Sequence, residues 1–246
     1  MSEKHFLKEK LIFVMGGGKF GTNALRYFTD KDAKVLVADI NHDCLAHSQV
    51  NFISDQIDVF DSLVGGQSAL VIGDAVEILL ATIKRHNLDL LVTAIRGNAI
   101  AKIVEVYVTK HGKKFEPYTS AVSEVLKSIP ESLVSFTDND SATIVVSYMP
   151  ANLRCRENCF PPKGFCPETG RLKQATMYKR LMFSIFGLTD VSGVLMSKQF
   201  TGGLGAIEGK DLLSLLKQLD NIKSPYIIAV GSACDCHGII NLAKIK

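Results

Sequence analysis

A glycine run between two regular segments limits this chain more than any other sequence feature. The run follows the apolar segment Leu11–Met15 and leads into Phe20–Phe28, whose apolar residues have helical spacing. It reads Gly16, Gly17, Gly18, Lys19, Phe20, Gly21, which fits the pattern G-x-G-x-x-G. In this pattern the first glycine makes a tight turn, the second lets the backbone approach a pyrophosphate, and the third lets helix and strand pack closely. The context predicts a strand, a phosphate-binding loop and a helix.

The segments after the run continue the alternation of strand and helix. Apolar stretches at Val35–Asp39, Ala69–Ile72 and Leu88–Ala94 predict three more strands, and Ala75–His86 predicts a helix. This order is typical of a parallel sheet covered by helices. We therefore predict an α/β fold, with a Rossmann-like, doubly wound parallel sheet in residues 1–115. Residues 116–246 are predicted to form a second, cysteine-containing α/β region, which one continuous sheet could also join to the first.

The dinucleotide site is predicted from the same region. Asp39 ends the second strand, 18 residues past Gly21, where a carboxylate accepts hydrogen bonds from the adenosine ribose. Because no Lys or Arg lies between Val35 and Ile83, NAD is favoured over NADP. The predicted cofactor-binding residues are Gly16, Gly18, Lys19, Phe20, Gly21, Asp39, Asp74 and Ala94. The alternative is a simple tight turn with Asp39 on the surface.

Residues 9–112 resemble a known group of nucleotide-binding domains. Val71-Ile72-Gly73-Asp74-Ala75 after the third strand, together with the glycine run and Asp39, is similar to the TrkA-type regulators of potassium uptake. The resemblance implies NAD or another adenine nucleotide, a place for Asp74 near the adenine, and frequent dimerisation. Asp74 is equally well placed to cap a helix. Residues 11–40 also resemble the dehydrogenase domain of siroheme synthesis proteins.

The second half of the chain departs from that pattern because it carries five of the six cysteines. They form two clusters, one of Cys155, Cys159 and Cys166 and the other of Cys234 and Cys236. Thiolates suit iron–sulfur clusters and zinc, and four are enough for either. Proline follows Cys166, as it follows a cluster cysteine in bacterial ferredoxins, although the spacing is not the ferredoxin spacing. An iron–sulfur cluster is favoured; zinc, thiol redox chemistry and disulfides are the alternatives.

Further candidates lie near the cysteines. His237 beside Cys236 is a candidate ligand or proton donor, and an ordinary surface histidine is the alternative. Gly202, Gly203 and Gly205 suggest either an anion cradle or a flexible turn. The strand pattern predicts a hairpin from Leu133–Thr137 to Ala142–Tyr148. Such a hairpin reverses the strand before the first cluster, so the two cysteine clusters need not meet.

Composition and charge limit the partners. The net charge of +3 and the lack of a long basic stripe argue against nucleic acid, and no apolar run is long enough to span a membrane. We expect a cytoplasmic protein with reduced cysteines, acting with a small-molecule substrate or an electron-transfer partner, and a homodimer is one arrangement that the resemblance implies. The leading hypothesis is an NAD-binding redox protein, an oxidoreductase if it turns over substrate. The alternatives are a non-enzymatic nucleotide or redox sensor and a zinc-stabilised nucleotide-binding module.

Overall fold

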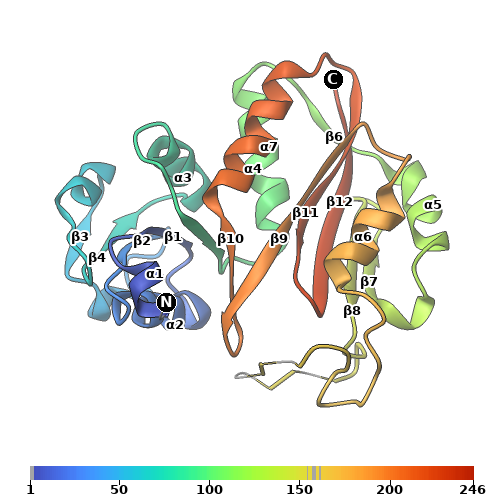
Figure 1. Ribbon diagram of the computed structural model, residues 1–246. Helices are drawn as coiled ribbons and strands as arrows, with labels where there is room; N and C mark the ends of the chain where they lie inside the picture. The colour runs from blue at the N-terminus through green and yellow to red at the C-terminus, as the bar shows by residue number, and fades with distance from the viewer. Residues whose placement is uncertain (1–2, 154, 157–158, 161) are drawn as a thin grey trace. The chain divides into compact units, whose positions relative to one another are not determined.

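The computed structural model describes residues 3–153, 155–156, 159–160 and 162–246, and it is a mixed α/β structure (Figure 1). Contacts divide the chain into two compact units, one of Met1–Gly97 with Ala206–Leu213 and the other of Asn98–Gly205 with Ser214–Lys246. The predicted boundary near residue 115 follows helix α4 (Ala99–Lys110), which belongs to the second unit. In the described part of the chain, no helix has both the length and the apolar character needed to cross a membrane.

The first unit is built on a parallel sheet. Its strand order is β3-β4-β2-β1-β5, and β10 pairs with β5 in the antiparallel direction. Its strands are β1 (Leu11–Met15), β2 (Lys34–Asp39), β3 (Phe52–Ser54), β4 (Ser68–Ile72), β5 (Leu90–Thr93) and β10 (Leu204–Glu208). Its helices are α1 (Glu3–Leu7), α2 (Lys19–Thr29) and α3 (Ala75–Ile83). The four strands and two helices predicted here from apolar spacing are confirmed, although α3 ends at Ile83 rather than His86.

Burial explains why these segments could be predicted from their apolar residues. Strand β1 is buried from Ile12 to Met15, as expected for a strand covered on both faces. Helix α2 buries Ala24, Leu25 and Phe28, which lie on one face at helical spacing. The short edge strand β3 has exposed residues and no comparable apolar signal, so it was not predicted.

The second unit contains a largely antiparallel sheet. Its strand order is β9-β11-β12-β8-β7, with β6 paired to β12. Its strands are β6 (Phe115–Pro117), β7 (Val134–Asp138), β8 (Thr143–Ser147), β9 (Val191–Thr201), β11 (Tyr226–Ala233) and β12 (His237–Ile245). Its helices are α4, α5 (Val122–Lys127) and α6 (Met177–Ile185), and α7 (Gly209–Asn221) begins in the first unit and ends in this one.

The predicted hairpin from β7 to β8 is confirmed, because the two strands pair in the antiparallel direction. Strand β12 follows β11 and has no counterpart among the strands predicted from the sequence. Asn241 and Lys244 interrupt the apolar pattern of β12, yet Asn241 is used: its side-chain amide contacts the Thr143 hydroxyl at 2.7 Å and the Ser141 carbonyl at 2.9 Å.

One core joins the elements that position the second unit's loops. Helix α6 packs against β9, β11 and β12, and its residues Met177, Leu181 and Ile185 are fully buried in a cluster with Tyr148 and Val146. Helix α4 also contacts β11 and β12. The sheet is therefore anchored near the points where both cysteine segments leave it.

Candidate cysteine-lined site

The two cysteine clusters meet at one end of the second sheet. Strand β12 is antiparallel to both β11 and β8, so β8 and β11 run in the same direction and end on the same side. Residue pairing shows that β8 and β11 end at the same height in the sheet, because His237 lies opposite Ser147 and Gly238 lies opposite Ala233. The predicted hairpin suggested that the two cysteine clusters need not meet. That inference did not include β12, whose antiparallel pairing with both neighbours makes β8 and β11 run in the same direction. Cys155 follows β8 and Cys234 follows β11. The loop that leads from β8 to α6 lies beyond the ends of these strands (Figure 1).

The turn from β11 to β12 is held by backbone hydrogen bonds. Its Cys234 N–H donates to the His237 carbonyl at 2.9 Å, and the first N–H groups of α6 donate to the turn: Met177 to the Asp235 carbonyl and Tyr178 to the Cys234 carbonyl, each at 3.1 Å. The start of a helix leaves N–H groups without partners inside the helix, so these carbonyls satisfy them. Helix α6 thereby fixes the second cysteine cluster.

The Cys234 sulfur is an acceptor in this turn. The backbone N–H groups of Cys236 and His237 both point to it, each at 3.4 Å. These two backbone donors fix the position of the Cys234 sulfur in the turn.

The first cluster is held by a small loop closure and by contacts from distant residues. Phe165 pairs with Leu172 in an isolated bridge, and the Cys166 N–H donates to the Arg171 carbonyl at 2.8 Å. The side-chain amide of Gln199 in β9 donates to the Cys159 carbonyl at 2.8 Å. These bonds give the proline-rich loop a defined path toward the sheet.

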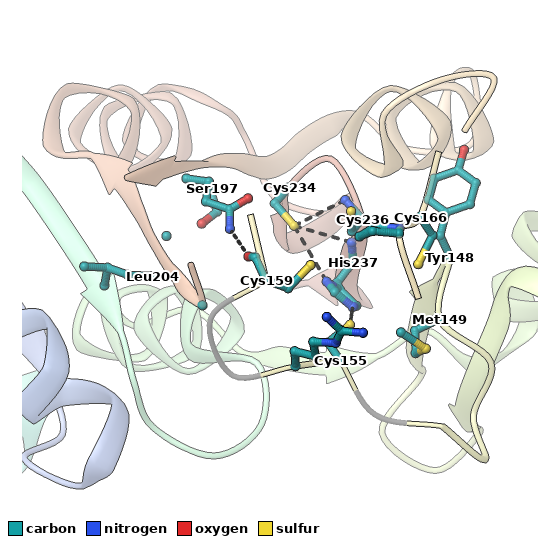
Figure 2. Close-up of a pocket in the computed structure, with 15 residues that line it drawn as sticks. Tyr148, Met149, Cys155, Cys159, Cys166, Ser197, Leu204, Cys234, Cys236 and His237 are labelled. Carbon is teal, nitrogen blue, oxygen red and sulfur yellow. Dashed lines mark hydrogen bonds between the residues drawn. The ribbon is translucent and has the colours of Figure 1, made fainter. Parts of the chain in front are cut away.

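All five cysteines line one cavity of about 260 Å³, together with His237. Figure 2 shows their side chains arranged around it. The Cys155 Sγ lies 3.3 Å from His237 Nε2, and the Cys234 Sγ lies 3.9 Å from His237 Nδ1. Lys173 donates from its Nζ to the Cys236 Sγ at 3.4 Å. Small-molecule pockets usually measure about 300–1,000 Å³, so this cavity is small for an organic substrate.

The environment changes the acidity of the thiols. Desolvation raises the pKa of Cys155 and Cys159, and the charges of neighbouring groups raise the pKa of Cys155 further: these are Cys159, Cys166, Glu168 and Cys234. Desolvation raises the pKa of Cys236 to about 11. Desolvation opposes ionisation of Cys166 as well, but hydrogen bonds from Thr169 and the Glu168 backbone leave its pKa below the usual value.

His237 is held mainly as a neutral ring. Although its side chain keeps solvent access, the surrounding protein atoms desolvate it and lower its pKa, and the nearby Lys173 charge lowers it again. A neutral imidazole is the form that binds metals. The candidate role of His237 as a ligand therefore stays open.

The donor set suits a soft metal. Among the described side chains, no three of His, Cys, Asp or Glu are already placed as a ready set of metal ligands. The six cysteines, all within the described part of the chain, are free thiols. Thiols gathered in one desolvated cavity gain most when a metal replaces their protons, because burial penalises bare thiolates.

The glycine run forms a separate site in the first unit. Gly16 has a φ of +96°, in the region that favours glycine, and a methyl group at Gly21 would overlap the Gly16 carbonyl. The two oxygens of Asp39 accept from backbone N–H groups: Oδ2 from Gly17 at 2.6 Å and Oδ1 from Asn41 at 2.8 Å. The carboxylate therefore braces the loop.

The other predicted cofactor residues lie around this loop. Gly18, Lys19 and Phe20 are exposed at the start of α2, and a methyl group at Gly18 would meet no atom within 4 Å. Ala94 follows β5 and borders Gly16, since its carbonyl would contact a methyl group there at 3.0 Å. Asp74 caps α3 by accepting from the Val76 and Glu77 N–H groups, which confirms its capping role.

Some site residues carried no signal in the sequence. Lys173 and Gln199 reach the cysteines across 63 and 40 positions of sequence, and neither lies in a recognisable motif. Gly203, with a φ of +72°, lies in the turn between β9 and β10, which fits the flexible turn proposed for this glycine segment.

Comparisons with other proteins cover nearly the whole chain. A family profile described as "Uncharacterized protein, C-terminal domain" matches residues 84–246, and a companion described as "Uncharacterized protein, N-terminal domain" matches residues 11–94. An "Uncharacterized protein" of Archaeoglobus fulgidus is 29% identical over 231 residues, which cover 94% of this chain and 98% of that protein. No solved structure shows significant similarity.

Proposed function

The chain belongs to the family of the C-terminal domain matched over residues 84–246, and from its site we propose that it is an NAD-binding redox protein with a cysteine-ligated iron–sulfur cluster. The observation that carries the proposal is the convergence of five thiols, from two distant segments, on one small cavity. The brace of Asp39 on the glycine loop supports the nucleotide part.

Four of the five thiols form the proposed ligand set. Cys155, Cys159, Cys166 and Cys234 are close enough for the charge of each of the other three to affect Cys155. Cys234 has two N–H donors directed at its sulfur, and Cys166 has a lowered pKa. Because a ligand must be deprotonated, the lowered pKa of Cys166 favours binding, and the two N–H donors orient the Cys234 sulfur.

Cys236 is the proposed thiol outside the set. Its sulfur accepts from the Lys173 ammonium group, and its pKa of about 11 makes it costly to ionise. We assign Cys236 to the wall of the cavity, where Lys173 contacts its sulfur. This narrows the set of five cysteines to the four that a cluster needs.

When bound, an iron–sulfur cluster supplies one-electron chemistry at this end of the sheet. The chain's own residues have separate tasks. Cys155, Cys159, Cys166 and Cys234 bind; the turn amides of Cys236 and His237 orient the Cys234 sulfur; and Tyr148 and Met149 line the cavity. At the other site, the exposed amides at the start of α2 are suited to a pyrophosphate.

The second candidate is a zinc-stabilised nucleotide-binding module without redox activity. The position of His237 between Cys155 and Cys234 favours it, because mixed cysteine and histidine sets are typical of structural zinc. A sensor of nucleotide or redox state, as the TrkA-like sequence suggests, is compatible with either metal.

An anaerobic NADH titration followed by nicotinamide fluorescence tests the nucleotide part. We expect saturable binding that weakens about tenfold or more in Asp39→Ala, because loss of the carboxylate releases the Gly17 amide and removes the ribose acceptor. Asp43→Ala is the matched control, since that carboxylate is exposed and close by in sequence. Equal affinity of Asp39→Ala and the wild type would remove Asp39 from the site. Turnover of NADH with an artificial acceptor would favour an enzyme over a sensor.

A further inference from the structure

The segment that carries the first cysteine cluster and α6 has a charge opposite to that of the rest of the chain. Residues 150–186 contain seven Lys or Arg and two Glu, a net charge of +5. The whole chain has a net charge of +3, so the remaining residues carry a net charge of −2. The positive excess is therefore confined to the surroundings of the cysteine site.

The same segment exposes large apolar side chains. Phe160 and Phe165, each next to a cysteine of the first cluster, are 66% and 44% exposed, and Leu172 is 74% exposed. Phe183 on α6 and Phe186, the residue after its end, are 75% and 84% exposed. Exposed apolar groups that gather in one segment among polar neighbours mark interaction sites, whereas scattered single ones are ordinary.

Helix α6 shows that this exposure is organised. Met177, Leu181, Ser184 and Ile185 are buried against the sheet. Lys179 and Phe183 lie at positions i and i+4 of α6 and are exposed, so the helix presents a cation and an aromatic ring on its outward side, and the exposed Phe186 directly follows the end of the helix at Ile185. These side chains share exposure and one segment of the chain, and we call them the basic aromatic face: Phe160, Phe165, Leu172, Lys179, Phe183 and Phe186.

The charge argues against a second copy of this chain as the occupant. A twofold contact would place the same patch on both sides and oppose two segments of +5. Like charges placed opposite each other in an interface cost several kcal/mol. A partner with an acidic surface meets no such repulsion.

The engagement of the cations argues against nucleic acid. Arg156 pairs with Glu168 at 2.7 Å, and Arg171 donates to the Ser132 carbonyl at 2.7 Å. Arg180 donates to the Tyr148 hydroxyl at 2.8 Å, and Lys173 to Cys236. Cations that are already hydrogen-bonded to protein acceptors are less available to bind phosphates directly. They still contribute to the positive electrostatic potential of the surface, which attracts an acidic protein.

We propose that the basic aromatic face docks an acidic, ferredoxin-like carrier protein that exchanges single electrons with the cysteine site. This rests on the proposed function. With a cluster held by the cysteines, one electron would leave the partner's reduced iron–sulfur centre, which would become oxidised, and would reduce that cluster. No covalent bond forms or breaks, and no proton is required.

The test uses the full chain, purified anaerobically, and a purified acidic ferredoxin as the probe. Calorimetric titration should show binding that weakens at least about tenfold between low and high salt. Lys179→Glu and Phe183→Ser should each weaken binding about fivefold or more. The controls Lys217→Glu and Phe136→Ser change exposed residues outside the face and should stay within about twofold. Thermal unfolding of each variant checks the fold.

Absence of ferredoxin binding, equal effects of face and control variants, or tighter binding of a single-stranded RNA than of ferredoxin would each overturn the docking proposal. Sedimentation that shows a dimer disrupted by Phe183→Ser would also overturn it, by assigning the face to a second copy. Stopped-flow mixing with reduced ferredoxin separates the two proposals: docking without bleaching of visible absorbance defeats the redox function, whereas a bleachable cluster without docking defeats only this inference.

Discussion

The glycine loop and the cysteine loop are fixed in different ways. The glycine loop is held by nearby backbone and by one carboxylate, Asp39, only 22 positions from its partner Gly17. The contacts at the cysteine loop span 40 positions from Gln199 to Cys159 and 82 from Cys155 to His237. Local backbone geometry persists without a ligand, whereas a loop placed by distant side chains gains stability from whatever binds its thiols. We therefore expect the glycine loop to keep its shape without a ligand, and the cysteine loop to gain its stability from the proposed metal.

The largest expected effect is the loss of metal in Cys155→Ser. This substitution removes the thiol that interacts with the other three proposed ligands, so iron and sulfide content should fall from about one cluster per chain to near zero. Unfolding should also occur at a lower temperature, because ligand binding to the folded state no longer stabilises it. Metal analysis and thermal unfolding measure both.

Cys236→Ser is the matched control, since it changes a thiol in the same cavity that contacts Lys173. It should keep most of the metal. If Cys236→Ser loses metal as completely as Cys155→Ser does, the proposed division into four ligands and one wall residue is wrong.

The next effect concerns the stability of the glycine loop. Gly21→Ala places a methyl group against the Gly16 carbonyl, where the backbone must shift, and should lower the free energy of unfolding by about 2–4 kcal/mol. Urea denaturation measures the change. A loss below about 0.5 kcal/mol would show that the strand–helix contact is loose.

Gly18→Ala separates binding from stability. Its methyl group meets no protein atom, so the free energy of unfolding should change by less than about 1 kcal/mol. If a pyrophosphate lies against the loop, the same methyl group should weaken NADH binding about tenfold or more. Unchanged affinity in a stable Gly18→Ala variant would mean that no nucleotide approaches this amide.

The smallest effect belongs to Asp74. Replacing it with Ala removes the acceptor for two N–H groups at the start of α3 and should cost about 1 kcal/mol of stability. If the TrkA-like sequence also places Asp74 near an adenine, NADH affinity falls too. A normal affinity would leave Asp74 as a helix cap alone.

Sequence reasoning succeeded where spacing within one element decides the structure. Leu11–Met15 appears with the predicted bounds and Ala75–Ile83 with the predicted first residue, because their apolar patterns reflect the faces they bury. The hydrogen bonds of Asp74 follow from local chemistry, so its capping role was also readable. The turn at the glycine run could be predicted for the same reason, because it too depends on local backbone geometry.

Sequence reasoning failed where pairing between distant segments decides the structure. Strand β12 was missed because Asn241 and Lys244 break its apolar pattern, and Asn241 is explained by partners distant in sequence, namely Asn98, Ser141 and Thr143. Without β12, the direction of β8 relative to β11 could not be derived. The meeting of the two cysteine clusters was therefore stated as an open question, and the contacts of Lys173 and Gln199 had no signal at all.

The central claim is that the cysteine cavity holds an iron–sulfur cluster, and its most direct test is the metal content and visible spectrum of anaerobically purified protein. The account predicts brown protein containing iron and acid-labile sulfide, with broad visible absorbance that dithionite bleaches. Colourless protein with one zinc ion per chain would contradict it and would favour the zinc-stabilised module instead.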